Sequence, residues 1–249
     1  MRTLLAIPIY NEAKYLQGVL RRVRPHIRDI LLVDDGSTDA TPEMLRSEPG
    51  VFQIRHPVNL GYGQSLIDAF AFARRRGYDW IITMDCDEQH EPEQIPDFLR
   101  AAAEDDADVI SGSRYLVPTA GDEPPPDRRE INRTITRLLN SLLELGITDA
   151  FCGFKAYRVK ALARLRLTVP GYAMPLQFWV QAARAGLRIR ELPVLRIYKD
   201  ASRVFGGSLD DATVRLRHYL DVLSAELGCD GRVLAPNELT GTVCPGPRC

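Results

Sequence analysis

The sequence predicts an α/β fold: a doubly wound, mostly parallel sheet in a single domain with a C-terminal helical and antiparallel extension. Three observations predict it. Short apolar runs alternate with amphipathic segments five times in about 115 residues, which is typical of parallel strands joined by helices. Polar clusters follow the apolar runs, as expected at the carboxyl edge of such a sheet. A chain of 249 residues with 45% apolar content is also long enough to bury a full core.

Five apolar runs have the length of buried strands. They occupy residues 3–9, 30–33, 51–55, 80–84 and 108–111. Most of the segments between them repeat apolar residues every three or four positions, which indicates helices packed by one face. Asn11 is a suitable N-cap for the first of these helices. Strand followed by helix, repeated in this way, builds the parallel part of the sheet.

The chain changes character after Tyr115. Residues 118–126 are rich in Gly, Pro and Asp and are expected to form a mobile loop. An amphipathic helix, a helix around Phe178 and Trp179, an antiparallel edge strand and a final amphipathic helix then follow. The first, third and fourth of these cover residues 128–145, 187–197 and 209–227. We therefore expect a catalytic domain over residues 1–227 and a flexible tail over residues 228–249.

The stretch from residue 81 to residue 90 carries the strongest chemical signal. A buried strand delivers Asp85, Asp87 and Gln89 in alternation at its carboxyl end. In an extended backbone such residues share one face, so their oxygen-bearing side chains are expected to converge. Two carboxylates and an amide are hard ligands suited to Mg²⁺ or Mn²⁺. A solvated acidic turn is the alternative interpretation of Asp-x-Asp alone.

Four further polar clusters also follow predicted strands. They are Tyr10-Asn11-Glu12, Asp34-Asp35, residues 59–63 and Ser113-Arg114. The carboxyl ends of parallel strands lie along one edge of a sheet, and ligands of open α/β sheets bind in the crevice there. Because all five clusters fall on the same edge, the sequence predicts a crevice for a nucleotide and a metal ion.

Composition and charge argue against several classes of function. The formal net charge is −1, from 32 basic and 33 acidic residues, so nothing global favours nucleic acid as a partner. No apolar run approaches the roughly 18–20 residues of a membrane span, and Met1 leads straight into a strand, so we expect a cytoplasmic protein. The five cysteines show no metal-type spacing and are expected to be reduced thiols.

The helix expected over residues 128–145 has a basic side. At 100° per residue, Arg129, Arg133 and Arg137 span about 80° of its surface, roughly opposite its apolar residues. Such a stripe is either a solvated face above a core face or a basic surface for an anionic lipid headgroup or phosphate. The second interpretation favours a peripheral position at the inner face of the membrane.

Six motifs occur in a fixed order over roughly residues 3–220. They are Pro8-Ile9-Tyr10-Asn11-Glu12, Val33-Asp34-Asp35-Gly36-Ser37-Thr38-Asp39, Asn59-x-Gly61-x-Gly63, Met84-Asp85-x-Asp87-x-Gln89-His90, Gly112-Ser113-Arg114-Tyr115 and Asp149-x-x-Cys152-Gly153-Phe154. This order resembles glycosyltransferase family 2, and within it the dolichyl-phosphate mannose synthase-like branch of polyprenyl-phosphate glycosyltransferases. The resemblance implies a glycosyltransferase A-type nucleotide-sugar fold and an inverting transfer of the sugar.

The resemblance also implies roles for individual residues. The implied nucleotide-binding positions lie at or after the ends of the first three strands and are Pro8, Tyr10, Glu12, Asp35, Gly61 and Gly63. The family's metal-binding Asp and Gln match Asp87 and Gln89, so Mg²⁺ or Mn²⁺ is the implied cofactor. Asp85 matches the carboxylate beside the sugar-nucleotide. The phosphate-contacting arginines match Arg114 and Arg203.

Three departures separate this chain from the family pattern. The late loop usually reads Arg-x-x-Gly-x-Ser-Lys, and here residues 203–209 read Arg-Val-Phe-Gly-Gly-Ser-Leu, without the lysine. Cys152 stands where Ser or Thr is commoner, and Glu88 replaces an apolar residue. These changes leave the implied donor site intact and leave the acceptor open.

The acceptor decides which further groups the reaction needs. The leaving diphosphate develops negative charge, which a divalent ion can neutralise. An acceptor phosphate is already ionised and needs no general base, whereas a hydroxyl needs a nearby carboxylate, for which Asp149 is the candidate. Asp149 is equally suited to capping a turn. We expect a nucleotide-diphosphate sugar donor and a polyprenyl phosphate acceptor, with Arg129, Arg133 and Arg203 as candidate phosphate contacts; a soluble or glycan hydroxyl is the alternative.

Three other classes of function fit less well. A nucleotidyltransferase should carry a Gly-rich, basic loop after the first strand, where this chain has Pro8-Ile9-Tyr10-Asn11-Glu12. A dinucleotide-dependent oxidoreductase needs Gly-x-Gly-x-x-Gly, and Gly61-x-Gly63 lacks the third glycine. A non-catalytic binding protein of glycosyltransferase type has no need of the complete Asp85, Asp87 and Gln89 set.

Overall fold

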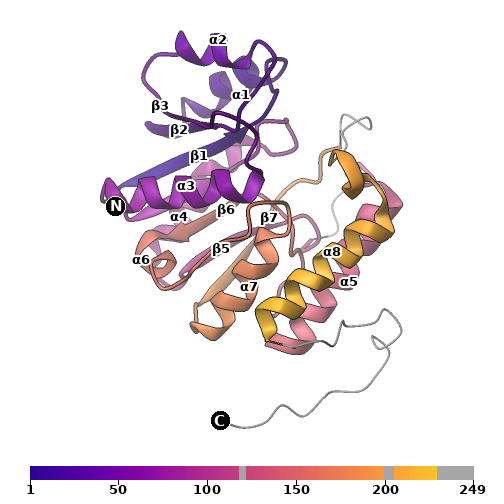
Figure 1. Cartoon of the computed structure of the whole chain (residues 1–249). Helices are drawn as coiled ribbons and strands as arrows, with labels where there is room; N and C mark the ends of the chain where they lie inside the picture. The colour runs from indigo at the N-terminus through magenta and orange to yellow at the C-terminus, as the bar shows by residue number, and fades with distance from the viewer. Residues whose placement is uncertain (118–121, 199–204, 229–249) are drawn as a thin grey trace.

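Figure 1 shows the computed structural model, which describes residues 1–117, 122–198 and 205–228. Within these ranges seven strands form one sheet in the order β3-β2-β1-β4-β6-β5-β7. The strands are β1 (Thr3–Ile9), β2 (Asp29–Asp34), β3 (Phe52–Arg55), β4 (Trp80–Thr83), β5 (Val109–Ser113), β6 (Lys155–Arg158) and β7 (Ile189–Pro193). Six of these strands run parallel, and β6 is antiparallel to both of its neighbours. The predicted doubly wound, mostly parallel sheet is confirmed.

Helices cover both faces of this sheet. They are α1 (Leu16–Val23), α2 (Thr41–Arg46), α3 (Tyr62–Arg75), α4 (Ile95–Ala103), α5 (Pro126–Leu143), α6 (Val159–Leu162), α7 (Met174–Arg184) and α8 (Ala212–Leu227), with short 3₁₀ turns η1 (Pro92–Gln94) and η2 (Gly207–Asp210). α1, α2 and α4 close one apolar core, and the other five helices close a second core on the opposite face. β1 feeds both, because Leu4 and Ala6 enter one core while Leu5 and Ile7 enter the other.

The order of the strands fixes where a crevice opens. β2 and β3 extend the sheet on one side of β1, and the chain then returns to place β4 on the other side of β1. The connections that leave the carboxyl ends of β1 and β4 therefore diverge. In open α/β sheets this switch point is where ligands bind. The polar segments after residues 9 and 83 lie at it.

A group of three helices forms much of the C-terminal half. α5, α7 and α8 pack against one another, and α5 and α8 lie side by side (Figure 1). α8 begins at a strong cap, because the Asp211 carboxylate accepts hydrogen bonds from the backbone N–H groups of Thr213 and Val214. The helices expected around Phe178 and over residues 209–227 are confirmed. In the described residues no helix combines the length and apolarity needed to cross a bilayer.

One prediction about the strands after residue 150 was wrong, and one strand there was not predicted. β7 does lie at an edge of the sheet, but it runs parallel to β5 rather than antiparallel. β6, which the sequence analysis did not predict, lies antiparallel between β4 and β5. β6 carries the chain toward the amino edge, the segment before α7 returns it to the carboxyl edge, and α7 brings it back, so β7 can only run parallel. The tail from residue 229 and the loop residues 118–121 lie outside the described residues.

Candidate functional site

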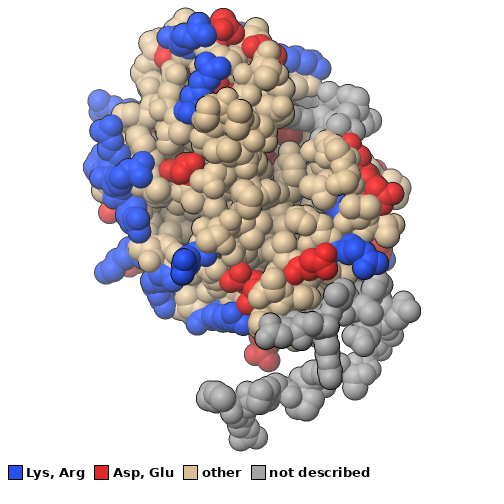
Figure 2. Space-filling model, viewed as in Figure 1, with Lys and Arg blue, Asp and Glu red and all other residues tan. Residues whose placement is uncertain are grey.

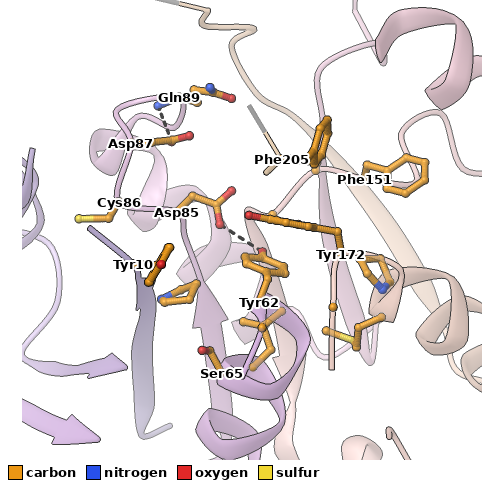
Figure 3. A pocket seen from close by; sticks show the side chains of 18 of the residues that line it. Tyr10, Tyr62, Ser65, Asp85, Cys86, Asp87, Gln89, Phe151, Tyr172 and Phe205 are labelled. Atoms are coloured by element: carbon orange, nitrogen blue, oxygen red, sulfur yellow. Dashed lines mark hydrogen bonds between the residues drawn. The ribbon is translucent and has the colours of Figure 1, made fainter. Parts of the chain in front are cut away.

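A cavity of about 740 Å³ opens at the carboxyl ends of β1 and β4. Nine of the residues to which the sequence analysis gave a nucleotide, metal, sugar or phosphate contact line it, namely Pro8, Tyr10, Glu12, Asp35, Gly61, Asp85, Asp87, Gln89 and Arg114. Figure 3 shows Asp85, Asp87 and Gln89 along one side of this pocket and Phe151 and Phe205 on the opposite side. Segments that are far apart in the sequence therefore meet in one crevice.

Asp85 is held from three directions at the end of β4. Its Oδ1 accepts a hydrogen bond of 3.1 Å from the Tyr62 hydroxyl, and its Oδ2 lies 3.9 Å from Nε2 of the buried His90. The backbone of Gly153 lies directly beneath, because a Cβ atom built there would come within 2.5 Å of Asp85 Oδ2. Glycine at position 153 therefore makes room for this carboxylate.

Asp87 and Gln89 lie on a turn rather than on a continuing strand. β4 ends at Thr83, and Glu88 adopts a left-handed φ of 59°. The Gln89 backbone N–H donates a 3.0 Å hydrogen bond to Asp87 Oδ1, which stabilises the turn. The strand-like alternation expected from the sequence was therefore wrong for residues 85–89. The turn nevertheless brings both side chains to the same pocket wall as Asp85 (Figure 3).

The donor set on this wall fits a hard divalent cation. Asp85, Asp87 and Gln89 offer carboxylate and amide oxygens, which suit Mg²⁺ or Mn²⁺. The described residues contain no group of three or more His, Cys, Asp and Glu side chains able to hold a metal by themselves. An ion here would thus complete its coordination with substrate oxygens and water, as Mg²⁺ does in phosphate-binding sites.

Asp35 shapes the loop beside the crevice. It is 3% exposed, and its two oxygens accept hydrogen bonds of 2.8 and 2.9 Å from the backbone N–H groups of Leu60 and Gly61. Oδ1 also lies 2.7 Å from Nδ1 of His56, whose Nε2 is 3.0 Å from Asp68 Oδ2. His56 was not found in the sequence because it lies in a loop without a motif of its own. Its position fixes the Asp35 carboxylate.

The two glycines of the loop before α3 have a packing role. A Cβ atom at Gly61 would come within 2.4 Å of the Pro170 carbonyl oxygen, and one at Gly63 within 2.4 Å of the Val169 carbonyl oxygen. Gly61 also has a φ of 107°. Gly63 faces this neighbouring segment and does not line the pocket, so the expected nucleotide contact at Gly63 is replaced by close packing of two backbones.

Arg114 and Asp149 form a buried ion pair at the far end of the crevice. Arg114 Nε and the Asp149 Oδ2 atom are 2.7 Å apart, and Nη2 donates to Oδ1 at 2.9 Å. Asn132 and the Phe151 N–H add hydrogen bonds to Oδ1 of this fully buried carboxylate. Burial raises the pKa of Asp149, but the charge and hydrogen bonds of Arg114 outweigh it and hold the pKa well below its ordinary value.

This pair changes the roles expected for both residues. Asp149 does not line the pocket and is a weak proton acceptor, so it is unsuited to be the base for a hydroxyl acceptor. Arg114 makes its bidentate contact with Asp149 through Nε and Nη2. Its Nη1 donates a 3.2 Å hydrogen bond to the Tyr198 hydroxyl. The bidentate phosphate contact expected of Arg114 is therefore already taken by a carboxylate of the chain.

The basic side of α5 faces away from the crevice. Arg129 and Arg133 are exposed, and they form ion pairs with Glu123 and Glu130. Neither lines the pocket, and Arg203 lies outside the described residues. The residues of α5 that do line it are Arg128, Ile131 and Asn132. These three residues share the face of the helix that carries its apolar positions, whereas the basic stripe lies on the other face.

A chain of aromatic contacts crosses the pocket from the acidic wall to the cationic end. The Tyr62 ring stacks on Tyr172 at 5.8 Å, and Tyr172 meets Phe205 edge-on at 5.3 Å. The guanidinium groups of Arg128 and Arg215 lie 4.8 and 4.5 Å from the centre of the Phe205 ring. The pocket therefore has an acidic end, an aromatic middle and a cationic end.

These features define an α/β protein whose switch-point crevice suits a nucleotide and a hard cation. The family described as Glycosyl transferase family 2 matches residues 5–166. The chain is 31% identical over 230 residues to an undecaprenyl-phosphate mannosyltransferase of Micrococcus luteus, covering 88% of this chain and 94% of that one. It is 30% identical over 245 residues to a polyprenol monophosphomannose synthase of Mycolicibacterium smegmatis, covering 93% and 89%.

Solved structures share the fold. Glucosyl-3-phosphoglycerate synthase from Mycobacterium tuberculosis, crystallised with Mn²⁺, uridine diphosphate and glucosyl-3-phosphoglycerate, superposes with a TM-score of 0.71 at 19% identity. The match covers 91% of this chain and 80% of that one. The chain described above belongs to glycosyltransferase family 2.

Proposed function

We propose that this protein moves a sugar from a nucleotide-diphosphate donor to a polyprenyl phosphate, with inversion at the anomeric carbon and with a divalent metal. The observation that carries the proposal is the polarity of one crevice. Its wall of Asp85, Asp87 and Gln89 lies opposite Phe205 (Figure 3). The guanidinium groups of Arg128 and of Arg215, which is paired with Asp127, lie over the Phe205 ring and form the cationic end. A donor diphosphate and an acceptor phosphate can thus meet between them. The relatives in Micrococcus luteus and Mycolicibacterium smegmatis carry names of this activity.

The donor belongs at the β1 and β4 side of the crevice. Pro8 lies near the end of β1, Tyr10 and Glu12 follow it, and Asp35 holds the loop beside them, so the nucleoside would lie there. Asp87 and Gln89 would hold Mg²⁺ or Mn²⁺. When bound, this ion supplies positive charge to the leaving diphosphate, typically worth several kcal/mol. Asp85, fixed by Tyr62 and the Gly153 backbone, is then left beside the sugar.

The acceptor belongs at the α5 and α8 side. A phosphate monoester is ionised at neutral pH, so its oxygen can attack the anomeric carbon without a general base. This requirement agrees with the burial of Asp149, the carboxylate that a hydroxyl acceptor would have needed. Arg128 lines the pocket over Phe205 and is the arginine best placed to meet the acceptor phosphate. A polyprenyl chain would keep the enzyme peripheral at the cytoplasmic surface of a membrane while it acts.

A transfer assay with two kinds of acceptor tests the proposal. Nucleotide-sugars are first screened by thermal shift with and without Mn²⁺ to find the donor. Transfer is then measured to a short-chain polyprenyl phosphate and to simple glycosides. We expect transfer to the polyprenyl phosphate only, and its loss in excess EDTA. Transfer only to hydroxyl acceptors would replace the lipid acceptor, and donor binding without any transfer would favour a binding protein.

A further inference from the structure

Lys155 is a buried cation that the activity described so far does not use. It begins β6 and pairs with Thr83 of β4 and Ser111 of β5, close to the carboxyl ends of both strands. Its side chain lies on the same face of the sheet as Tyr157 and is 3% exposed, yet it lines the pocket. The chain thus places an ammonium group at the floor of the crevice, where β4, β5 and β6 meet.

The contacts of Lys155 leave most of its hydrogen-bonding capacity unused. Its Nζ donates to the carbonyl oxygen of Cys152 and lies 5.5 Å from the centre of the Trp179 ring. An ammonium group has three donors, and the described residues supply neither a second acceptor nor an ion pair. Burial lowers the pKa of this amine, as expected for a cation withdrawn from water.

Neighbouring carboxylates offset this charge only in part, because Asp149 and Asp85 attract the ammonium group without forming an ion pair with it. Asp149 is committed to Arg114 and Asn132, and Asp85 is held by the Tyr62 hydroxyl. A buried charge without a partner is destabilising, so such groups are normally paired or bind a ligand of opposite charge. The group that would complete Lys155 is an oxyanion that enters the crevice from outside.

Building on the function proposed above, we propose that Lys155 binds a phosphate oxygen of a substrate at the floor of the crevice. The ammonium group, already fixed by the Cys152 carbonyl and the Trp179 ring, presents its remaining N–H donors to that oxygen. Such a fixed donor needs no reorganisation when charge develops on the phosphate. The oxygen comes either from the donor diphosphate or from the acceptor phosphate, which share this chemistry.

Two variants separate phosphate binding from a structural role. Lys155→Met keeps the apolar stem and removes the charge and all donors. Lys155→Gln also removes the charge but keeps an N–H donor for the Cys152 carbonyl. Lys160→Met is the matched control, because Lys160 is an exposed lysine of α6 that does not line the pocket. Affinities for UDP, GDP, UMP and GMP are measured by calorimetry, and the KM for a short-chain polyprenyl phosphate by transfer.

The measurements decide whether Lys155 contacts the donor diphosphate or the acceptor phosphate. If Lys155 meets the donor, both variants bind the nucleoside diphosphate about ten- to a hundredfold more weakly and bind the monophosphate nearly as before. If it meets the acceptor, diphosphate affinity stays and the KM for the polyprenyl phosphate rises by a similar factor. A Gln variant that behaves like the wild type, or two variants with neither change, would overturn the proposal. A wild type that neither binds nucleotide nor transfers sugar would instead overturn the proposed function.

Discussion

Among single residues, Asp87 is the carboxylate whose replacement should reduce activity far more than stability. It lies on a turn at the rim of the pocket, partly exposed, and makes no contribution to either apolar core. We expect Asp87→Ala to lower the free energy of unfolding by only about 0.5–1.5 kcal/mol, the usual contribution of a hydrogen bond such as the one it accepts from the Gln89 N–H. Transfer should fall at least a hundredfold because the divalent ion loses a ligand.

The control for Asp87 is Glu91→Ala, which removes a carboxylate four positions later that does not line the pocket. Initial rates of transfer over a Mn²⁺ titration, beside thermal unfolding, make the comparison. Turnover like that of the wild type in Asp87→Ala, or full activity in excess EDTA, would contradict a metal at this wall.

The Arg114–Asp149 pair should dominate stability at its end of the crevice. Removing one partner of a buried pair costs about 3–5 kcal/mol because the other charge is left buried alone. We therefore expect Asp149→Asn to lower the free energy of unfolding by about that amount in denaturant titrations. Glu93→Gln, which breaks the exposed pair with Arg22, should cost at most about 1 kcal/mol. Equal losses in the two variants would contradict the argument.

The pH dependence of the same pair has a definite sign. Arg114 depresses the pKa of Asp149 in the folded protein, and an unfolded Asp titrates near pH 3.9. The stabilisation is therefore fully present above about pH 4 and is lost as the pH falls below that value. The free energy of unfolding of the wild type should therefore fall more between about pH 4 and pH 2 than that of Asp149→Asn. Between pH 6 and pH 9 the difference between them should be constant.

At the scale of elements, the start of α3 shows how packing overrides helix propensity. Alanine normally stabilises a helix over glycine by roughly 0.5–1 kcal/mol. A Cβ at Gly63 would nevertheless come within 2.4 Å of the Val169 carbonyl and 2.7 Å of Met174 Cβ. Gly63→Ala should therefore destabilise the protein by about 1–3 kcal/mol, the usual cost of overpacking.

Gly18→Ala in α1 is the matched test of that statement. A Cβ there would meet only the flexible Glu88 Oε1 at 3.5 Å, so the helix propensity should prevail and the midpoint of thermal unfolding should rise slightly. Opposite signs in the two variants are expected. A stabilising Gly63→Ala would mean that α3 and the segment over residues 169–171 are not held together in this way.

Elements with an apolar run could be predicted, and β6 could not. β1 to β5 could be predicted from runs that contain apolar residues, whereas β6 has four residues with Lys155 and Arg158 at its ends. It becomes a strand because β4 and β5 leave a gap between them that only an antiparallel segment enters. The direction of β7 likewise depends on α7 and not on its own composition. Tertiary context decides such segments.

Site residues also divide into those with a local signal in the sequence and those whose role depends on a distant partner. Acidic and polar residues that follow strands, such as Asp85 and Asp87, reach the pocket because a parallel sheet collects strand ends. Residues whose role depends on a distant partner were missed or misread. Asp149 was assigned to the acceptor before its pairing with Arg114 could be known, and Lys155 and His56 carry no local signal. Spacing in the sequence does not report which charges meet.

For the molecule as a whole, the position of basic surface predicts how it would meet a membrane. Figure 2 shows Lys and Arg gathered along the left margin, where Figure 1 places the amino end of β1, far from the pocket. Of the basic stripe of α5, Arg129 and Arg133 are paired with glutamates, which reduces their attraction for an anionic surface. Near such a surface an unpaired Lys or Arg contributes about 1 kcal/mol. Binding through α5 should thus be weak and salt-sensitive.

Flotation with vesicles containing anionic lipid tests which surface is used. The triple change of Arg129, Arg133 and Arg137 to Ser should reduce the bound fraction at low salt, and raising the salt should release the wild type because added ions screen these charges. The control changes three exposed arginines at the opposite edge of the sheet to Ser, namely Arg28, Arg74 and Arg75. If the protein meets the membrane through α5, this control should bind as the wild type does. Loss of binding in this control but not in the α5 triple would place the membrane at the amino edge, away from the pocket, and would contradict acceptor delivery along α5.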